Sequence, residues 1–253
     1  MRKLDYNQTI IDIVEWIREY LKSANANGVV VGISGGIDSA TTTSLCVKAL
    51  GKENIVGLGL PCSSIPQDLI DGQMFAENLG ICFIIIDLTN IYNEFLKSTS
   101  ASINPKQLAM ANIKPRLRMI TNYFIGQSLG KFLVAGTSNR SELSIGYFTK
   151  YGDGGADFEP IGSLYKCEVR EIAKLLNVPD VIIKKPPSAG LWEGQTDEDE
   201  IGIKYDRLDE ILYRIDNGLS ITDLNNDDIK MVKDMMEKAR HKLSMPPVFT
   251  IKS

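Results

Sequence analysis

Eight consecutive residues, GISGGIDS from Gly32 to Ser39, carry the clearest chemistry in this chain. They follow the apolar residues Val29 to Val31 and precede a helical stretch, so a buried strand is predicted to lead through a glycine turn into a helix. Unpaired backbone N–H groups in such a turn and at the helix start bind phosphate. Gly35 and Gly36 let a ligand approach the main chain, and the hydroxyls of Ser34 and Ser39 add hydrogen-bond donors. The run therefore indicates a phosphate site.

Asp38 adds a second chemical signal to this run. A carboxylate beside bound phosphate is repelled unless a divalent cation bridges the two, so we expect Asp38 to hold a divalent cation. The run has neither the Lys-Ser/Thr ending of the Walker A loop nor the spacing of the dinucleotide loop G-x-G-x-x-G. A tight strand-to-helix turn without a ligand is the alternative. The order Ser, Gly, Gly, Asp, Ser after a valine strand favours the ligand site.

A second segment, residues 136–166, gathers several reactive side-chain types: the hydroxyl of Thr137, the amide of Asn139, the acid of Glu142 and the amines of Lys150 and Lys166. Glu142 opens a predicted helix, where a carboxylate is also favoured by the helix dipole, so a capping role is its alternative. Asp153 and Asp157 lie among glycines, and aspartates in such positions are commonly turn residues.

The elements that must position these groups alternate along the first half of the chain. Continuously apolar runs predict strands over residues 29–33, 55–60, 81–86 and 132–135, and helical patterns cover residues 5–24, 40–50, 67–79 and 105–128. This pattern predicts an α/β fold with a doubly wound parallel sheet flanked by helices. Polar residues follow every strand, at the carboxyl edge where such sheets collect active groups. We expect one pocket there.

The second half of the chain is less regular. Residues 146–160 and 186–200 are glycine-rich or acidic and too long to be simple connectors, so we expect binding loops, with a helix over 166–177 between them. Two or three amphipathic helices follow from residue 204, and paired prolines predict an extended end. We expect a single domain over residues 1–253 with a helical C-terminal appendage. Trp16 is predicted to pack on a helix face, Trp192 to close over ligand, and Asp197–Glu200 to form a solvated helix start.

Composition excludes several classes of protein. The chain has 253 residues, 43% of them hydrophobic and 24% charged, as in an ordinary globular protein. A net charge of −4 argues against a nucleic-acid partner, and no apolar run approaches the roughly 20 residues of a membrane span. Acidic residues in the amphipathic N-terminal stretch argue against a signal peptide. None of the four cysteines has C-x-x-C spacing, so we expect buried or nearly buried thiols and a cytoplasmic location.

The SGGIDS loop resembles the pyrophosphate loop of N-type ATP pyrophosphatases. Together with GYFTKYGDGGAD, NIKPRLR, PSAGLWEGQTDEDEIG and the pair His241–Lys242, it makes the chain resemble the ammonia-dependent NAD⁺ synthetase family over about residues 6–249. The resemblance implies an adenine nucleotide alpha hydrolase-like fold. It also implies that ATP adenylates the nicotinate carboxylate of deamido-NAD⁺, with release of pyrophosphate, and that ammonia then displaces AMP to give NAD⁺.

The resemblance also implies roles for individual residues. The ATP site would comprise Gly32, Ile33, Ser34, Gly35, Gly36, Ile37, Asp38, Ser39, Thr137, Lys166 and Ser188, the last standing where the family usually has threonine. Asp38 and Glu142 would bind Mg²⁺, and Asp38, Lys166 and Asp153 would be catalytic. The dinucleotide would contact Arg116, Lys150, Asp157, His241 and Lys242. Arg118 could replace Arg116, because the interval to Thr137 is one residue longer than is usual in the family.

His241 taken alone would be a solvated or helix-capping residue. The resemblance further implies a homodimer with the dinucleotide site at the subunit interface, near the helix that contains Arg116. Because the ATP-pyrophosphatase module takes up this whole sequence, we expect free ammonia as the nitrogen donor, and a separate glutaminase stays open. No nucleic-acid or membrane partner is expected.

Two other functions are compatible with the SGGxDS loop. A tRNA-modifying ATP pyrophosphatase would share the SGGxDS loop but would have a basic surface, an RNA-binding appendage or a catalytic cysteine pair. A non-catalytic nucleotide sensor would have lost Asp38, Glu142 or Lys166, and this chain has all three.

Overall fold

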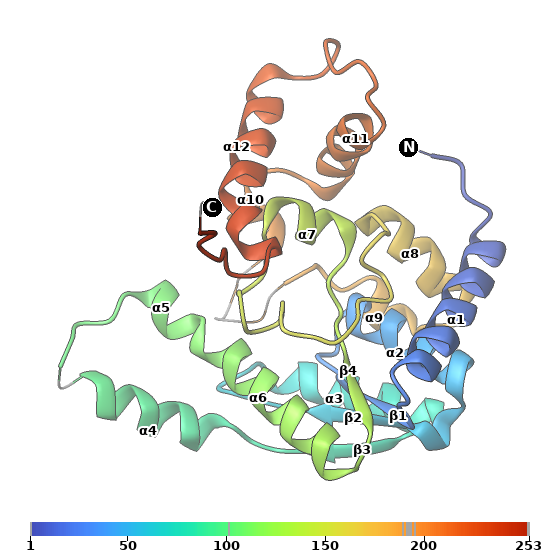
Figure 1. Cartoon of the computed structure of the whole chain (residues 1–253), viewed down its shortest axis with the longest axis vertical. Coiled ribbons are helices and arrows are strands. Elements are labelled where there is room, and N and C mark those ends of the chain that lie inside the picture. The colour runs from blue at the N-terminus through green and yellow to red at the C-terminus, as the bar shows by residue number, and fades with distance from the viewer. Residues whose placement is uncertain (1, 101, 189, 191–193, 195, 252–253) are drawn as a thin grey trace.

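Four parallel strands form the centre of the molecule (Figure 1). The computed structural model describes residues 2–100, 102–188, 190, 194 and 196–251. The strands are β1 (Gly28–Gly32), β2 (Ile55–Gly59), β3 (Cys82–Ile85) and β4 (Phe132–Ala135), and they lie in the order β3-β2-β1-β4. Each strand lies within one residue of its predicted bounds. The predicted parallel α/β fold is therefore confirmed.

The strand order places β1 beside β4, although about 100 residues separate them in the chain. Val31 of β1 pairs with Ala135 of β4, and Val30 pairs with Val56 of β2. The chain adds β2 and β3 on one side of β1 and then returns to add β4 on the other side. Ligands in open parallel sheets bind where the strand order reverses in this way. Here that point lies between the segments that follow β1 and β4.

Helices cover both faces of the sheet. One face carries α1 (Tyr6–Ser23), α2 (Ile37–Leu50), α3 (Pro66–Leu79) and α8 (Lys166–Leu175), and the other carries α4 (Thr89–Ser100) and α6 (Ile113–Ser128). Val29 and Val31 belong to the first core, whereas Val30 belongs to the second, as the alternation of side chains along a strand requires. Burial on both faces explains why the strands are continuously apolar in sequence.

Most predicted helices are present, with local differences. Helix α2 begins three residues earlier than predicted, because the extended Gly36 is its N-cap. The helix predicted over 105–128 is divided at Asn112 into α5 (Gln107–Ala111) and α6. Helix α4 was not predicted, since its hydroxyl residues and asparagines have low helix propensity. The short α9 (Asp180–Ile183) was not predicted either.

The predicted helical appendage is confirmed and has a core of its own. It packs α11 (Tyr205–Asp216) and α12 (Asn226–Leu243) against α7 (Arg140–Ile145), with α10 (Asp197–Ile201) beside them at the top of Figure 1. This second core includes Ile145, Tyr165, Ile203, Leu208, Leu212 and Val232. Among the described residues, none of the helices is both long enough and apolar enough to cross a membrane.

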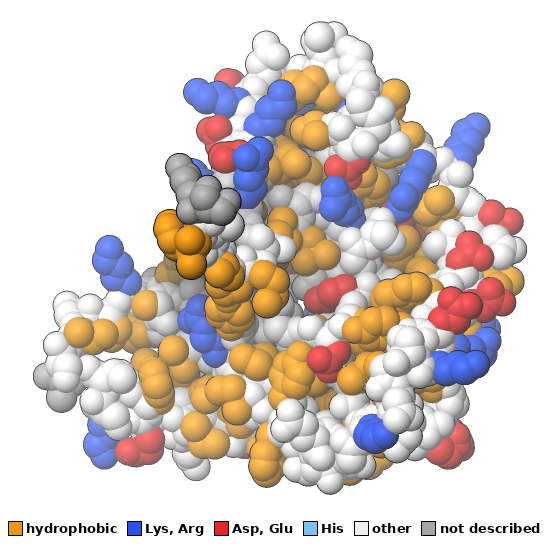
Figure 2. All heavy atoms as spheres, viewed as in Figure 1, with side chains coloured by type: hydrophobic (Ala, Val, Ile, Leu, Met, Phe, Trp, Pro, Cys, Tyr) orange, Lys and Arg blue, Asp and Glu red, His pale blue; other side chains and the backbone are white. Residues whose placement is uncertain are grey.

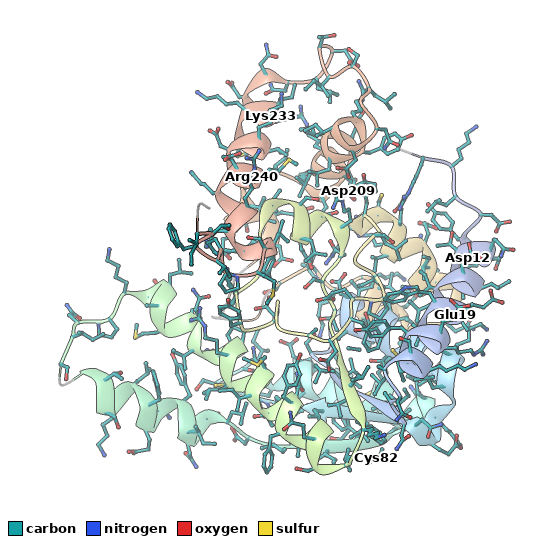
Figure 3. All side chains as sticks on the ribbon, viewed as in Figure 1. Asp12, Glu19, Cys82, Asp209, Lys233 and Arg240 are labelled. Carbon is teal, nitrogen blue, oxygen red and sulfur yellow. The ribbon has the colours of Figure 1, made fainter. Side chains whose placement is uncertain are left out.

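The four cysteines are free thiols. Cys46 and Cys62 are buried and Cys167 is partly buried, but Cys82 is exposed, so the prediction of buried or nearly buried thiols is wrong for Cys82. It lies on β3, the edge strand of the sheet, where only one neighbouring strand covers it (Figure 3). Trp16 packs against the rings of Tyr20 and Phe158, as predicted. Trp192 lies outside the described residues.

Candidate active site

The segment between β1 and α2 makes a tight turn against α3. Gly35 has φ +76°, and a Cβ there would lie 2.3 Å from the backbone oxygen of Asp68, so only glycine fits. The Ser39 hydroxyl donates to the Gly36 carbonyl at 3.0 Å and accepts from the Ser34 amide at 3.2 Å. No side chain caps the N-terminus of α2 at Gly36. The turn thus has the backbone form of an anion site.

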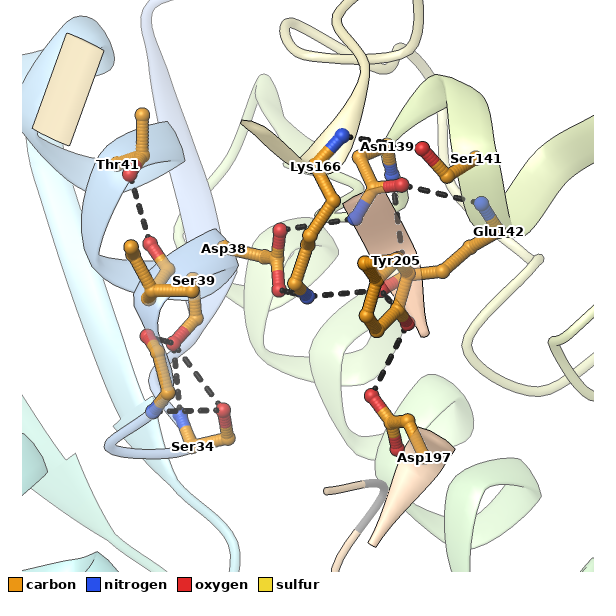
Figure 4. Close-up of polar contacts among 12 residues, drawn as sticks. Ser34, Asp38, Ser39, Thr41, Asn139, Ser141, Glu142, Lys166, Asp197 and Tyr205 are labelled. Carbon is orange, nitrogen blue, oxygen red and sulfur yellow. Dashed lines mark hydrogen bonds and ion pairs between the residues drawn. The ribbon is translucent and has the colours of Figure 1, made fainter. Parts of the chain in front are cut away.

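Three charged side chains from three helices meet beside this turn (Figure 4). Lys166, the first residue of α8, directs its Nζ at Asp38 Oδ2 of α2 at 2.5 Å and at Glu142 Oε1 of α7 at 3.1 Å. The side chain of Lys166 is 2% exposed, while those of Asp38 and Glu142 keep 18% and 14% exposure. The carboxylates are therefore open to a ligand, and the ammonium lies beneath them.

The electrostatics of this cluster depend on burial and on opposite charge. Burial lowers the pKa of Lys166, but the carboxylates of Asp38 and Glu142 outweigh it, so the net shift is upward and the ammonium stays charged. Burial raises the pKa of Glu142 to about 7, against the lowering effect of Lys166. The cluster therefore has a permanent positive charge and one acid that titrates near neutrality.

Asn139, the N-cap residue of α7, links the segments that follow β1 and β4. Its Oδ1 accepts the Glu142 amide at 3.0 Å, and Glu142 Oε2 accepts the Asn139 amide at 3.3 Å, which makes a capping box for α7. Its Nδ2 donates to Asp38 Oδ1 at 3.0 Å. Glu142 therefore has the capping role that was its alternative, through Oε2, and it also pairs with Lys166 through Oε1.

Two further residues of the cluster were missed from the sequence. The Tyr205 hydroxyl of α11 donates to Asp197 Oδ2 at 3.1 Å and lies 3.4 Å from Glu142 Oε1. Asp197 is 4% exposed and also accepts from Tyr147 at 3.2 Å, so the prediction of a solvated helix start is wrong for Asp197. Burial raises the pKa of Asp197, against the lowering effect of Lys166. An acidic run gives no sequence signal that tells its one inward-facing member from its solvated neighbours.

A second group of predicted residues gathers between α6 and the end of α12. The Lys150 amine donates to the His241 carbonyl, and the Arg116 guanidinium donates to the Lys150 carbonyl at 3.3 Å. Lys242 donates to the carbonyls of Gly146 and Phe148 at 2.7 and 2.8 Å. We call Arg116, Lys150, His241 and Lys242 the basic cluster. It contains four of the five residues predicted to bind the dinucleotide, and His241 takes part through its backbone carbonyl.

Comparison with known proteins agrees with this geometry. The family model described as NAD synthase matches residues 9–246. The chain belongs to the NAD synthase family. It is 45% identical to the NH(3)-dependent NAD(+) synthetase of Archaeoglobus fulgidus over 98% of this chain and 99% of that protein.

Two solved structures have nearly the same backbone as this chain. The NMN synthetase of Francisella tularensis superposes with a TM-score of 0.90 at 34% identity, covering 98% of this chain and 100% of that one. The NH3-dependent NAD synthetase of Campylobacter jejuni superposes with a TM-score of 0.84, also at 34% identity and with the same coverage. The appendage is therefore part of the fold that these enzymes share.

Arg116 and Arg118 point to different places. Two residues apart on a helix, they lie on different faces of α6. Arg116 joins the basic cluster, whereas Arg118 donates to the Leu60 carbonyl at 3.1 Å and to Ser64 Oγ at 3.0 Å, at the end of β2. Of the two arginines, Arg116 is the one that binds the Lys150 backbone, and which of them contacts the substrate stays a prediction.

The remaining predicted residues make no hydrogen bond to Asp38, Glu142 or Lys166 among the contacts of the described residues. Thr137 is partly exposed in the turn after β4, and Ser188 is exposed. The Asp153 carboxylate accepts the Thr149 amide at 2.9 Å, as in a local turn, and has no hydrogen bond to Asp38, Glu142 or Lys166 in the described chain. Asp157 binds the Val134 amide at 2.7 Å and the Tyr123 hydroxyl at 3.1 Å. Asp157 thus holds the open edge of β4.

Proposed function

We propose that this protein is an NH3-dependent NAD⁺ synthetase, and the observation that carries the proposal is the Asp38–Lys166–Glu142 cluster beside the glycine turn in a member of the NAD synthase family. An oxygen of the nicotinate carboxylate of deamido-NAD⁺ attacks the α-phosphorus of ATP, and pyrophosphate leaves. Ammonia attacks the carbonyl of the resulting acyl-adenylate, AMP leaves with the bonding electrons, and the lost proton passes to solvent. The products are NAD⁺, AMP and pyrophosphate.

The glycine turn and α2 would hold the ATP phosphates. Backbone amides at the start of α2, which no side chain caps in the described residues, would supply donors, and the positive end of the helix dipole favours the anion. Lys166 would stabilise negative charge that develops on the departing pyrophosphate, since its ammonium is fixed and buried. Thr137 and Ser188 would contact the nucleotide, and Asp153 stays a proposed catalytic residue.

The residues present fit a magnesium ion. Carboxylate oxygens of Asp38 and Glu142 converge on one positive charge, and hard oxygen donors are those that Mg²⁺ prefers. In the described residues no group of three or more His, Cys, Asp and Glu side chains is arranged for a metal. Mg²⁺ bound to nucleotides commonly takes only one or two protein carboxylates plus phosphate oxygens. It would neutralise phosphate charge when bound.

The basic cluster would hold the pyrophosphate of the dinucleotide. Arg116, Lys150, His241 and Lys242 come from α6, the following loop and α12, so their joint position depends on the whole fold. Guanidinium and ammonium groups form strong charge-assisted hydrogen bonds with phosphate. Asp157, also proposed to contact the dinucleotide, is held by Val134 and Tyr123 and would contribute through its remaining lone pairs.

A homodimer is the proposed assembly. Ile91 and Phe95 of α4 and Ile120 and Phe124 of α6 are each spaced by four residues, and their exposed fractions are 55, 44, 58 and 66%. Figure 2 shows hydrophobic side chains gathered at the lower left, over the region where Figure 1 places α4 and α6. Large exposed apolar patches commonly mark protein interfaces. Since α6 also carries Arg116, this interface would adjoin the basic cluster.

We also propose that the protein is a single domain and is located in the cytoplasm.

The test of the function is pyrophosphate release from ATP and Mg²⁺ with deamido-NAD⁺, with and without ammonium. Release that depends on the dinucleotide, with NAD⁺ formed only when ammonium is present, is expected. Because one similar structure is an NMN synthetase, nicotinate mononucleotide is the competing substrate in a parallel assay. Preference for the mononucleotide would change the proposed substrate, and pyrophosphate release without any nicotinate compound would contradict the proposal.

The test of the homodimer is light scattering. The variant Phe124→Glu should be a monomer, while a fully active wild-type monomer would contradict the proposed dimer.

A further inference from the structure

The backbone at the start of α8 is bound by two side chains from other helices. The Ser141 hydroxyl accepts the amide of Lys166 at 3.0 Å and donates to Asp209 Oδ1 at 2.5 Å. The second oxygen of Asp209 accepts the Cys167 amide at 2.9 Å. Free N–H groups at a helix start need such partners, and here the appendage supplies one of them. Asp209 is labelled on α11 in Figure 3.

We propose that Asp209 is a positioning residue for the adenylation step, which fixes the backbone of Lys166 through Ser141; this rests on the proposed function. Ser141 immediately precedes Glu142 in α7. Lys166 and Glu142 are therefore joined twice, once by their side chains at 3.1 Å and once through the Ser141 hydroxyl at the Lys166 amide.

Burial makes this second connection rigid. Ser141, Asp209 and Lys166 are 0, 1 and 2% exposed, so water cannot replace a lost partner. Burial raises the pKa of Asp209, against the lowering effect of its bonds from Ser141 and Cys167. The positive end of the α8 dipole further favours its charge. Burying a carboxylate at this depth costs free energy, and Asp209 binds the Cys167 amide directly and the Lys166 amide only through the Ser141 hydroxyl.

The consequence is geometric. A buried lysine amine can be held within a few tenths of an ångström only if its Cα is held, because the side chain has four rotatable bonds. Misplacing a reacting group by about 1 Å can cost on the order of 100-fold in rate. Loss of the Asp209–Ser141 pair would therefore lower kcat with little effect on substrate binding.

A purely structural cap would have a different effect, and the chain contains its matched control. Glu168 is also 1% exposed and also caps α8, where it accepts the Tyr165 amide at 2.9 Å and pairs with Arg2. It has no hydrogen bond to Ser141 or Glu142 among the described residues. Glu168→Gln should therefore destabilise the same helix start without moving Lys166 relative to Glu142.

The experiment compares Asp209→Asn, Ser141→Ala and Glu168→Gln. Deamido-NAD⁺-dependent pyrophosphate release should show kcat about 10- to 100-fold lower in the first two variants, with KM for ATP within about threefold of wild type. The double variant Ser141→Ala/Asp209→Asn should have a kcat no lower than that of the slower of the two single variants. Both substitutions break the same connection, from Asp209 through Ser141 to the Lys166 amide. Glu168→Gln should keep kcat within about twofold of wild type at a similar loss of stability in urea.

A second measurement is independent of substrate. Hydrogen exchange at the Lys166 amide should be faster in Ser141→Ala and in Asp209→Asn but not in Glu168→Gln. If Asp209→Asn does not fold, Ser141→Ala alone decides. A near-normal kcat in Ser141→Ala, or an equal loss in Glu168→Gln, would overturn the proposal. If wild-type protein releases no pyrophosphate with deamido-NAD⁺, the proposed substrate fails, and unchanged exchange at Lys166 would then be the result that overturns the positioning role.

Discussion

The Asn139 side-chain nitrogen donates to Asp38 Oδ1 at 3.0 Å, across 101 residues of sequence. The oxygen of the same amide caps α7 at the Glu142 backbone. Because β1 and β4 are neighbours, one amide can connect the segment that follows each strand. It therefore sets the relative position of two carboxylates that come from distant parts of the chain.

Asn139→Asp should separate capping from catalysis. Aspartate caps a helix as well as asparagine does, so the thermal midpoint should change little. It would place a second carboxylate beside Asp38, where like charges repel, and kcat should fall by roughly 100-fold. Asn139→Ser keeps the cap without the added charge and should lose less activity. Steady-state kinetics with calorimetry on both variants would check this, and equal losses in the two would contradict it.

Asp38→Asn should impair turnover without unfolding the protein. The amide keeps the shape of the side chain but loses the charge that pairs with Lys166 and that would bind Mg²⁺. We expect pyrophosphate release at least about 100-fold slower than wild type, corresponding to roughly 2.7 kcal/mol of lost transition-state stabilisation. Asp12→Asn, on the exposed face of α1, is the matched control and should be fully active (Figure 3). Normal turnover in Asp38→Asn would remove its catalytic assignment.

Gly35→Ala should destabilise the fold and prevent ATP binding. A positive φ costs an alanine about 1–3 kcal/mol, and its Cβ would also lie 2.3 Å from the Asp68 carbonyl oxygen. Gly130→Ala provides the control, since its φ is +105° but nothing lies within 4 Å of the added Cβ. Urea unfolding should give the larger loss for Gly35→Ala, and only that variant should lose nucleotide affinity by calorimetry. Equal losses of stability would mean that the approach of α3 is unimportant.

Arg116→Ala and Arg118→Ala should differ in which property they change. Arg116 lies with Lys150, so its loss should raise KM for deamido-NAD⁺ about 10-fold and leave KM for ATP nearly constant. Arg118 binds the end of β2, so its loss should mainly reduce stability. Initial rates with each substrate varied would check this. An increase in the dinucleotide KM for Arg118→Ala alone would reverse the assignment.

Glu142 should make stability depend on pH. Its pKa is raised from 4.5 to about 7, so between these values the folded protein holds a proton that the unfolded chain has released. The free energy of unfolding that Glu142 contributes is therefore largest below about pH 4.5 and falls as pH rises toward 7. Urea unfolding at pH 5 and pH 8 should show a smaller decrease for Glu142→Gln than for wild type. An identical decrease would mean that the pKa of Glu142 is unshifted. Mg²⁺ affinity should also weaken below about pH 7, where this acid gains a proton.

The sequence was informative where function depends on local order. The GISGGIDS run predicted a glycine turn after a buried strand, and the valine, isoleucine and leucine runs located all four strands. These signals are local because a tight turn and a two-sided core restrict residue types directly. Helix α4 escaped prediction because its residues are poor helix formers and packing against α6 stabilises it.

The missed parts of the site depend on contacts between distant segments. Asp197 has the sequence environment of a solvated helix start. In the folded protein it is buried, where the hydroxyls of Tyr205 and Tyr147 donate to its carboxylate. Asp209 lies in an ordinary amphipathic helix, and nothing near it in the sequence indicates a partner 68 residues away at Ser141. Arg116 and Arg118 could be distinguished only once α6 was placed against the loop at Lys150.

The docking of α11 against α7 and α8 has a kinetic consequence. Tyr205 and Asp209 come from the last fifth of the chain, and both reach groups that belong to the catalytic cluster or hold it. During synthesis, the nucleotide turn, the sheet and α8 emerge from the ribosome well before α11 does. The cluster is then incomplete until the late helix arrives. During refolding, activity should return after most of the helical circular dichroism signal, because long-range contacts form last.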